Sequence, residues 1–200
     1  LIIITGALLG AFLVSRVAKR RGADPDTIWD ILPWVLIAGI IGARIWHIFT
    51  PPESMLVDGM NPYFIRPLEM LNIRNGGLGI PGAVMGGVLA LWLYCRKNKV
   101  SFTHWLDMIS PGLALAQAIG RWGNYFNQEV YGLPSNLPWA IKIDSAHRLP
   151  EFANVERYHP TFLYEFIWNI LNTLVLLWLL RKYDGKLKSG DVFLVYLIIY

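Results

Sequence analysis

The sequence predicts an all-α protein that crosses a membrane several times and carries a small polar head on the outer side. Hydrophobic residues make up 54% of the 200 residues and charged residues only 16%, a composition typical of multi-span membrane proteins. Apolar runs long enough to cross ~30 Å of hydrocarbon recur along the chain, and basic residues gather after every second run. We therefore expect residues 1–200 to form one membrane-embedded domain.

Six apolar runs are expected to be transmembrane helices. They cover about residues 1–17, 28–49, 78–95, 105–124 and 161–180, and the sixth begins near Asp191. The first run is unlike a signal peptide, because its basic cluster follows the apolar stretch instead of preceding it. The chain starts at Leu1 inside one run and stops at Tyr200 inside another, so we expect both ends to be truncated.

The basic residues indicate the orientation in the membrane. Eleven of the 18 follow the first, third and fifth runs: Arg16, Lys19, Arg20, Arg21, Arg96, Lys97, Lys99, Arg181, Lys182, Lys186 and Lys188. In the other connections basic residues such as Arg66 and Arg74 are diluted by acidic ones such as Asp58. The positive-inside rule then places the odd-numbered loops in the cytoplasm and the N-terminus outside. The basic runs are topology signals, so we expect no nucleic-acid partner.

Two longer connections fall on the outer side. Residues 50–77 contain four prolines and cannot form one helix, so we expect an irregular arm with an amphipathic piece around residues 64–73 at the membrane interface. Residues 125–159 form a larger polar insert, the predicted head. Within it, residues 139–143 alternate in the manner of a short strand.

Metal and disulfide chemistry are not indicated. Cys95 is the single cysteine of the sequence, which excludes an internal disulfide and a cysteine-rich metal site. The four histidines are too scattered for metal-ligand spacing, so we expect no metal and no cofactor. His47 is interpreted as a packing or interfacial residue, and Asp107 as a helix cap or interface residue.

The densest polar run follows the fourth apolar segment. Arg121, Asn124, Asn127 and Glu129 occur within nine residues, and at ~1.5 Å per residue Arg121 lies about 24 Å along its helix, near the outer boundary of the membrane. A guanidinium group is a planar fork of donors suited to bidentate phosphate binding. The alternative is that Arg121 extends to water or pairs with Glu129 as a structural clamp.

Small residues in the third segment have two interpretations. Gly82 and Gly86 form a small-xxx-small pair that lets two helices approach closely in lipid. Gly76 and Gly77 precede the helix, where they either complete the same packing or let a lipid headgroup approach the backbone. The sequence leaves both interpretations open.

The fifth segment carries one polar stripe at helical spacing, made of Thr161, Glu165, Asn169 and Asn172. Polar stripes within a membrane face the bundle interior or a wet cavity. Glu165 is therefore placed to support Arg121 or Arg44, although a purely structural ion pair is an equal alternative.

The polar run resembles the signature of a known family. The pattern Gly120-Arg-x-Gly-Asn-x-x-Asn-x-Glu-x-x-Gly132 is similar to that of the bacterial prolipoprotein diacylglyceryl transferases. The run Gly76-Gly-Leu-Gly-Ile-Pro-Gly82 and the motif His159-Pro-x-x-Leu-Tyr-Glu165 also look like that family, in the same order. The resemblance covers nearly the whole chain and implies seven spans, of which six are visible here, in the bacterial cytoplasmic membrane with the active site facing outside.

The resemblance also implies a reaction. The diacylglyceryl group of phosphatidylglycerol is transferred to the thiol of the lipobox cysteine in a prolipoprotein signal peptide, which forms a thioether and releases glycerol phosphate. By resemblance, Arg121 binds the phosphate and, with Asn124, stabilises the leaving group, while Glu129 orients Arg121 or relays a proton. The other residues implied in lipid binding or its support are Asn127, Gly132, which permits a turn, Gly76, Gly77, His159, Tyr164, Glu165 and Tyr200.

The chain departs from the family pattern in two respects. Some members have a histidine, often proposed as the base, where this chain has Pro81, so the general base is left open. The family also continues beyond Tyr200 with a further Arg, a Glu and a final span, and it usually has a Tyr-Gly pair before the first span.

Three other functions compete with this one. A lipid flippase or transporter would also line a membrane cavity with polar residues, but it usually places them near the midplane between related halves, and the sequence has no visible repeat. A structural membrane-assembly subunit would explain the small residues but not the run at 120–132. Another membrane lipid-headgroup transferase is the nearest enzymatic alternative.

Overall fold

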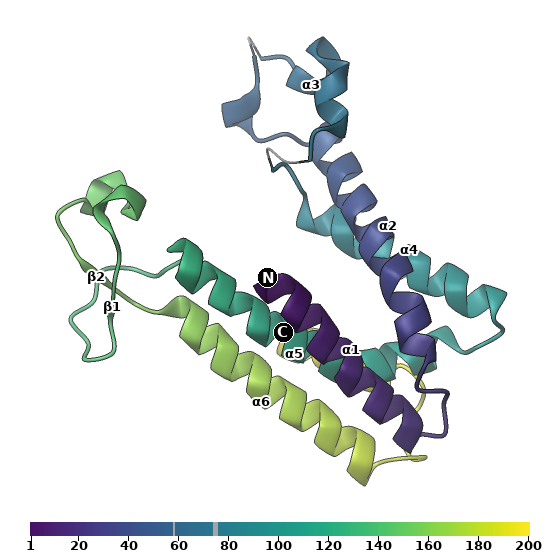
Figure 1. Cartoon of the computed structure of the whole chain (residues 1–200). Helices are drawn as coiled ribbons and strands as arrows, with labels where there is room; N and C mark the ends of the chain where they lie inside the picture. The colour runs from purple at the N-terminus through teal and green to yellow at the C-terminus, as the bar shows by residue number, and fades with distance from the viewer. Residues whose placement is uncertain (58, 74–75) are drawn as a thin grey trace. The chain divides into compact units, whose positions relative to one another are not determined.

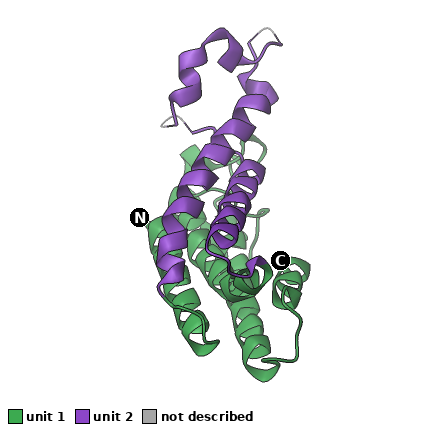
Figure 2. Ribbon diagram, turned by 90° about the vertical axis from the view of Figure 1, so that its right-hand side faces the viewer, with its two compact units in different colours: residues 1–25, 103–200 green, residues 26–102 purple. Residues whose placement is uncertain are grey.

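The computed structural model describes residues 1–57, 59–73 and 76–200 and divides the chain into two compact units. Asp58, Arg74 and Asn75 lie outside the described residues, and with them two of the charges that bear on the orientation. Unit 1 comprises Leu1–Pro25 and Thr103–Tyr200, and unit 2 comprises Asp26–Phe102, as coloured in Figure 2. The expectation of a single domain stays a prediction.

Unit 1 is built on long helices that lie side by side (Figure 1). These are α1 (Ile2–Arg20), α5 (Phe102–Asn127), α6 (Thr161–Lys182) and the shorter α7 (Asp191–Ile199). Helices α1 and α5 meet at glycines, because a Cβ atom on Gly10 would lie 2.6 Å from the carbonyl oxygen of Gly112. Helices α5 and α6 meet through Trp122, whose ring centroid lies 5.3 Å from that of Phe162.

Unit 2 pairs α2 (Thr27–Phe49) with α4 (Ile80–Lys97), the two helices running along each other in Figure 1. A Cβ atom on Gly82 would collide with the carbonyl oxygen of Gly42, and one on Gly86 would collide with that of Ala38. Only glycine allows so close an approach of two backbones. The helix-packing interpretation of Gly82 and Gly86 is confirmed.

The connection between α2 and α4 is not one helix, as its prolines predict. It contains three short elements: η1 (Glu53–Met55), α3 (Pro62–Ile65) and η2 (Pro67–Leu71). The expected amphipathic piece at 64–73 is interrupted, because α3 ends at Ile65 and a 3₁₀ turn begins at Pro67. Proline disfavours the helical conformation of the residue before it, which explains the break at Arg66.

The insert after α5 contains a small antiparallel pair of strands, β1 (Ile141–Lys142) and β2 (Arg157–Tyr158), with Ile141 opposite Tyr158. This confirms a strand within the alternating segment 139–143, although only two residues of it are extended in register. Two 3₁₀ turns, η3 (Ser145–His147) and η4 (Pro150–Phe152), follow β1. Tyr158 is fully buried and donates its hydroxyl hydrogen bond to the carbonyl of Phe152 at 2.9 Å, so it is the core residue of the insert.

The prediction of a mostly helical protein is confirmed. A helix also begins or ends within a few residues of each predicted bound. Among the described residues, three helices are long and apolar enough to cross a membrane: α1, α2 and α6. Large apolar side chains such as Ile37, Leu93 and Leu171 are about half exposed on the helices. Such extended exposed apolar surface fits contact with hydrocarbon.

Candidate functional site

Arg121 and Glu165 form the centre of the candidate site in unit 1. Arg121 lies near the C-terminal end of α5 and Glu165 near the N-terminal end of α6, and Arg121 Nη2 lies 2.5 Å from Glu165 Oε2. The same nitrogen lies 3.4 Å from Tyr200 Oη, to which it donates. Both members of the pair are partly exposed, at 27% and 41% of their side-chain surface, so the guanidinium group keeps donors available to a ligand.

Glu129 is held by two amides. Its Oε1 accepts hydrogen bonds from Asn124 Nδ2 at 3.3 Å and from Asn127 Nδ2 at 3.0 Å. The chain turns back here after α5, with Gln128 and Val130 at positive φ angles of 50° and 52°, and the amide of Glu129 donates to the carbonyl of Asn124 at 3.0 Å. The run at 124–129 is thus one closed network of side-chain and backbone bonds.

The carboxylate beside Arg121 is therefore that of Glu165 and not that of Glu129. This geometry corrects the expectation that Glu129 orients Arg121, and also the alternative of a clamp between these two residues. The physical reason is the reversal of the chain at residues 128–130, which brings Glu129 over the asparagines of the last turn of α5. Of the two partners expected for Glu165, the structure shows Arg121.

Gly132 is needed because two chain segments meet there. Its amide donates to the carbonyl of His159 at 3.0 Å, and a Cβ atom at this position would lie 2.8 Å from the Cβ of His159. Beside it, Thr161 Oγ1 donates to the carbonyl of Val130. The φ angle of Gly132 is not among the positive ones, so the close approach is the reason for glycine that the structure shows, and the expected role in a turn stays a prediction.

His159 and Tyr164 form a second hydrogen-bonded group with Trp139. The indole Nε1 of Trp139 donates to Tyr164 Oη at 2.8 Å, and His159 Nδ1 lies 3.1 Å from the same oxygen. An indole can only donate, so the Tyr164 oxygen is the acceptor in its bond with Trp139. The Tyr164 hydroxyl thus links the insert, through Trp139, to His159 just before the start of α6.

The polar stripe of α6 faces inward, as predicted. Asn169 and Asn172 are each 1% exposed. Asn169 Nδ2 donates to the carbonyl of Glu165 at 2.9 Å, whereas both polar atoms of the Asn172 side chain have no hydrogen-bond partner among the described residues. The helix therefore continues the polar surface from Glu165 into the interior of unit 1.

Two glycines beside Arg121 have no packing partner. A Cβ atom on Gly120 or on Gly123 would meet no atom within 4 Å in the described part of the chain. A glycine inside a helix costs about 1 kcal/mol relative to alanine, and no neighbouring helix accounts for these two. They leave bare backbone next to the guanidinium group. Both glycines belong to the motif that the sequence analysis identified, but the sequence assigned neither of them a role in the site.

In unit 2, Arg44 organises the arm between α2 and α4. Its guanidinium group donates to the carbonyls of Met70 at 2.8 Å and of Gly76 and Gly77 at 3.0 Å, and to that of Glu69. The residue is only 8% exposed. The sequence-based prediction treated Arg44 only as a partner of Glu165 and missed this role. An arginine within an apolar helix was the available signal, because such a charge requires partners.

The two predicted glycines of this arm differ. A Cβ atom on Gly77 would lie 2.6 to 2.7 Å from atoms of His47 and Arg44, so Gly77 serves packing. Gly76 has a φ angle of 82°, and its Cβ position meets no atom of the described residues within 4 Å, so the approach of a headgroup stays a prediction for Gly76. His47 lies edge-on to Tyr63 at 5.8 Å, which fits its interpretation as a packing residue.

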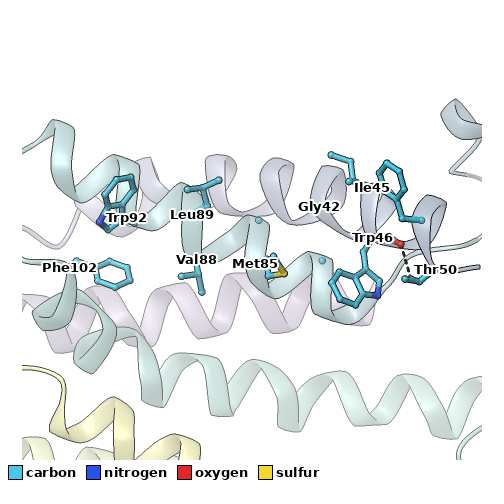
Figure 3. A pocket seen from close by; sticks show the side chains of 12 residues that line it. Gly42, Ile45, Trp46, Thr50, Met85, Val88, Leu89, Trp92 and Phe102 are labelled. Atoms are coloured by element: carbon cyan, nitrogen blue, oxygen red, sulfur yellow. Dashed lines mark hydrogen bonds between the residues drawn. The ribbon is translucent and has the colours of Figure 1, made fainter.

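An apolar groove of about 810 Å³ runs along α2 and α4 (Figure 3). Trp46 and Met85 lie toward one end, and Leu89 and Trp92 toward the other, and Gly42 also lines the groove. The lining is hydrocarbon and aromatic, which suits an acyl chain better than a polar substrate. No group of three or more His, Cys, Asp or Glu that could hold a metal ion occurs among the described residues.

Comparison with known proteins gives one family. Residues 1–200 match the family described as prolipoprotein diacylglyceryl transferase. The chain is similar to proteins named phosphatidylglycerol–prolipoprotein diacylglyceryl transferase from Chloroflexus aggregans (40% identity, 100% of this chain and 67% of that protein) and Frankia alni (42%, 100% and 51%). A third, from Synechococcus elongatus, is 41% identical over 100% of this chain and 68% of its own length. The chain spans from 47% to 69% of the length of the curated relatives compared.

Proposed function

The chain belongs to the prolipoprotein diacylglyceryl transferase family, and we propose that it transfers the diacylglyceryl group of phosphatidylglycerol to the lipobox cysteine of a bacterial prolipoprotein. The names of the relatives give both substrates for those proteins. The observation that carries the proposal to this chain is the guanidinium group of Arg121, fixed by Glu165 and bordered by the bare backbone of Gly120 and Gly123. This is a phosphate-binding fork with room for a headgroup beside it.

We propose the topology that the charges predict. Helices α1, α2, α4, α5 and α6 cross the bacterial cytoplasmic membrane and α7 belongs to a sixth span, with the N-terminus and the insert at 125–159 outside. In support, Arg121 and Glu165 lie at one end of α5 and α6, while the basic residues Lys19, Arg20 and Arg181 lie at the opposite ends of α1 and α6. The site then faces the outer leaflet.

The proposed chemistry breaks one C–O bond and forms one C–S bond. The thiolate of the lipobox cysteine attacks the glycerol carbon that carries the phosphate, and glycerol phosphate leaves with the bonding electrons. The phosphate gains one negative charge as its diester becomes a monoester. Arg121 faces that developing charge, and donors already in place for it lower the barrier because they need no reorganisation. The enzyme supplies no nucleophile in this reaction.

The remaining residues position the headgroup in this proposal. Glu165 orients Arg121, and the amide groups of Asn124 and Asn127 contact the glycerol hydroxyls of the lipid. Because Glu165 takes the orienting role, Glu129 keeps the second role expected of it, relaying the thiol proton. Pro81 has no titratable group and takes no part in proton transfer. His159 and Tyr164 support the junction beside the site.

Reconstitution tests the proposal directly. Liposomes of phosphatidylcholine with phosphatidylglycerol are supplied with a lipobox peptide and with a matched peptide in which Cys is replaced by Ser. A thioether-linked diacylglyceryl peptide, formed from the Cys peptide alone and only with phosphatidylglycerol present, is expected. Movement of lipid between leaflets without this product would assign the chain to flippases and refute the transferase.

A further inference from the structure

A second cavity lies at the other end of unit 1, away from Arg121. It has a volume of about 460 Å³ and is lined by residues of α1 and α6. Four basic side chains border it: Arg16, Lys19, Arg20 and Arg181. The rest of its wall is apolar, made by Phe12, Leu13, Val17 and Leu177. This basic pocket thus combines cationic and hydrocarbon walls.

Among the described residues, no ion pair involves a cation of the basic pocket. No carboxylate is among the residues that line the cavity. The ion pair found at this end of unit 1 joins Arg21 to Asp184 at 3.2 Å, so that acidic side chain is engaged outside the pocket. The guanidinium carbon of Arg16 lies 4.9 Å from the centre of the Phe12 ring, which holds a charge directly beside the apolar wall.

Topology alone does not account for this arrangement. Positive charge at the cytoplasmic ends of helices follows from the positive-inside rule, and it also offsets the helix dipole. Neither effect requires that cations from two helices surround one cavity. Like charges gathered there repel one another at a cost of about 1 kcal/mol for each close pair in water, and a bound anion removes that cost.

We propose that the basic pocket binds the headgroup of an anionic phospholipid of the inner leaflet. Its phosphate meets the four basic side chains, and the first part of an acyl chain lies against Phe12, Leu13 and Leu177. Basic pockets between membrane helices on the cytoplasmic side bind such headgroups, and the volume is in the range of ligand sites. The inference rests on the part of the proposed function that places α1 and α6 across the membrane.

This site is distinct from the one at Arg121. Glu165 and Arg181 are 16 positions apart on α6, which is ~24 Å of helix at 1.5 Å per residue. One headgroup cannot reach both ends. The lipid in the basic pocket is therefore not the lipid that is consumed, and it stays bound through turnover.

Native mass spectrometry of the full chain released from nanodiscs tests the proposal by counting retained lipids. The nanodiscs contain phosphatidylcholine with either phosphatidylglycerol or no anionic lipid. The pocket variant Arg16→Gln/Arg20→Gln/Arg181→Gln is compared with the control Arg96→Gln/Lys97→Gln/Lys99→Gln, which removes the same charge from the other basic loop. A further variant, Leu177→Trp, fills the cavity without changing any charge.

Wild type and the control are expected to retain one more phosphatidylglycerol than the pocket variant and Leu177→Trp. The apparent affinity of the pocket variant should fall on the order of 10-fold or more, given the contribution of each basic residue near a membrane. An equal loss of retained phosphatidylglycerol in the control would refute the pocket. So would retention of phosphatidylcholine equal to that of phosphatidylglycerol, or soluble glycerol phosphate that competes as well as phosphatidylglycerol does. Because retention is measured without the peptide, it is informative even if wild type makes no thioether product.

Discussion

Arg121 Nη2 and Glu165 Oε2 lie 2.5 Å apart and connect the end of α5 to the start of α6. The two residues are 44 positions apart in the sequence, with the whole insert between them. The pair places a charged, planar donor group at the end of the helix bundle of unit 1. Its partial exposure leaves the guanidinium group accessible, which is what a phosphate site requires.

Arg121→Lys should lower kcat/KM for thioether formation by about 10²- to 10³-fold, the range for loss of one preorganised donor to a developing anion. Lysine keeps the charge but lacks the fork. Arg66→Lys, which makes the same change in the exposed pair with Glu69, is the control and should leave kcat/KM unchanged. Activity of Arg121→Lys close to wild type would remove Arg121 from the phosphate role.

Glu165→Gln separates a functional pair from a structural clamp. An ion pair as exposed as this one contributes about 0–1 kcal/mol to stability, so the thermal unfolding midpoint should change little while turnover falls at least 10-fold. Glu156→Gln, which removes the exposed partner of Lys142, should alter neither quantity. A large loss of stability with turnover intact would favour the structural alternative.

Gly123→Ala should stabilise the protein while impairing its activity. The added methyl group meets no atom of the described chain, and alanine favours the helix by about 1 kcal/mol. If a lipid headgroup lies against this backbone, the methyl group intrudes on it and raises KM for phosphatidylglycerol. Gly112→Ala is the contrasting variant, since its Cβ would collide with a methyl carbon of Val14, and it should lower the unfolding midpoint. Unchanged KM in Gly123→Ala would place the headgroup elsewhere.

Gly77→Ala and Gly76→Ala should differ in stability. Both positions have positive φ angles, which cost an alanine about 1 kcal/mol. At Gly77 the new methyl group also collides with His47 and Arg44, whereas at Gly76 it meets no atom of the described part of the chain. The unfolding midpoint should therefore fall clearly further in Gly77→Ala. Equal midpoints in the two variants would contradict the packing role of Gly77.

The helices could be predicted because their signal is local. Apolar runs predicted the bounds of α2 and α6 to within a few residues. The expectation that Asp107 caps a helix or lies at an interface is confirmed as a cap. Its carboxylate accepts hydrogen bonds from the backbone amides of Gly190 and Phe193, at 2.7 and 2.9 Å, at the start of α7.

Pairings between distant segments could not be predicted in the same way. Glu129 and Glu165 are both carboxylates near the end of α5, and their spacing does not tell which one meets Arg121. The choice depends on the reversal of the chain at Gln128 and Val130, two residues with positive φ angles that have no glycine signal. The network around Arg44 was missed for a related reason, because its partners are backbone carbonyls, which every residue has.

In the arm of unit 2, many acceptors depend on a single donor group. Carbonyls from both η2 and the segment before α4 converge on Arg44. The loss of this one side chain leaves all of these carbonyls without their donor at once, so we expect the arm to open cooperatively, as one unit. Amide hydrogen exchange across residues 61–73 and 76–79 would then have a common opening rate, and Arg44→Leu would accelerate it in both ranges.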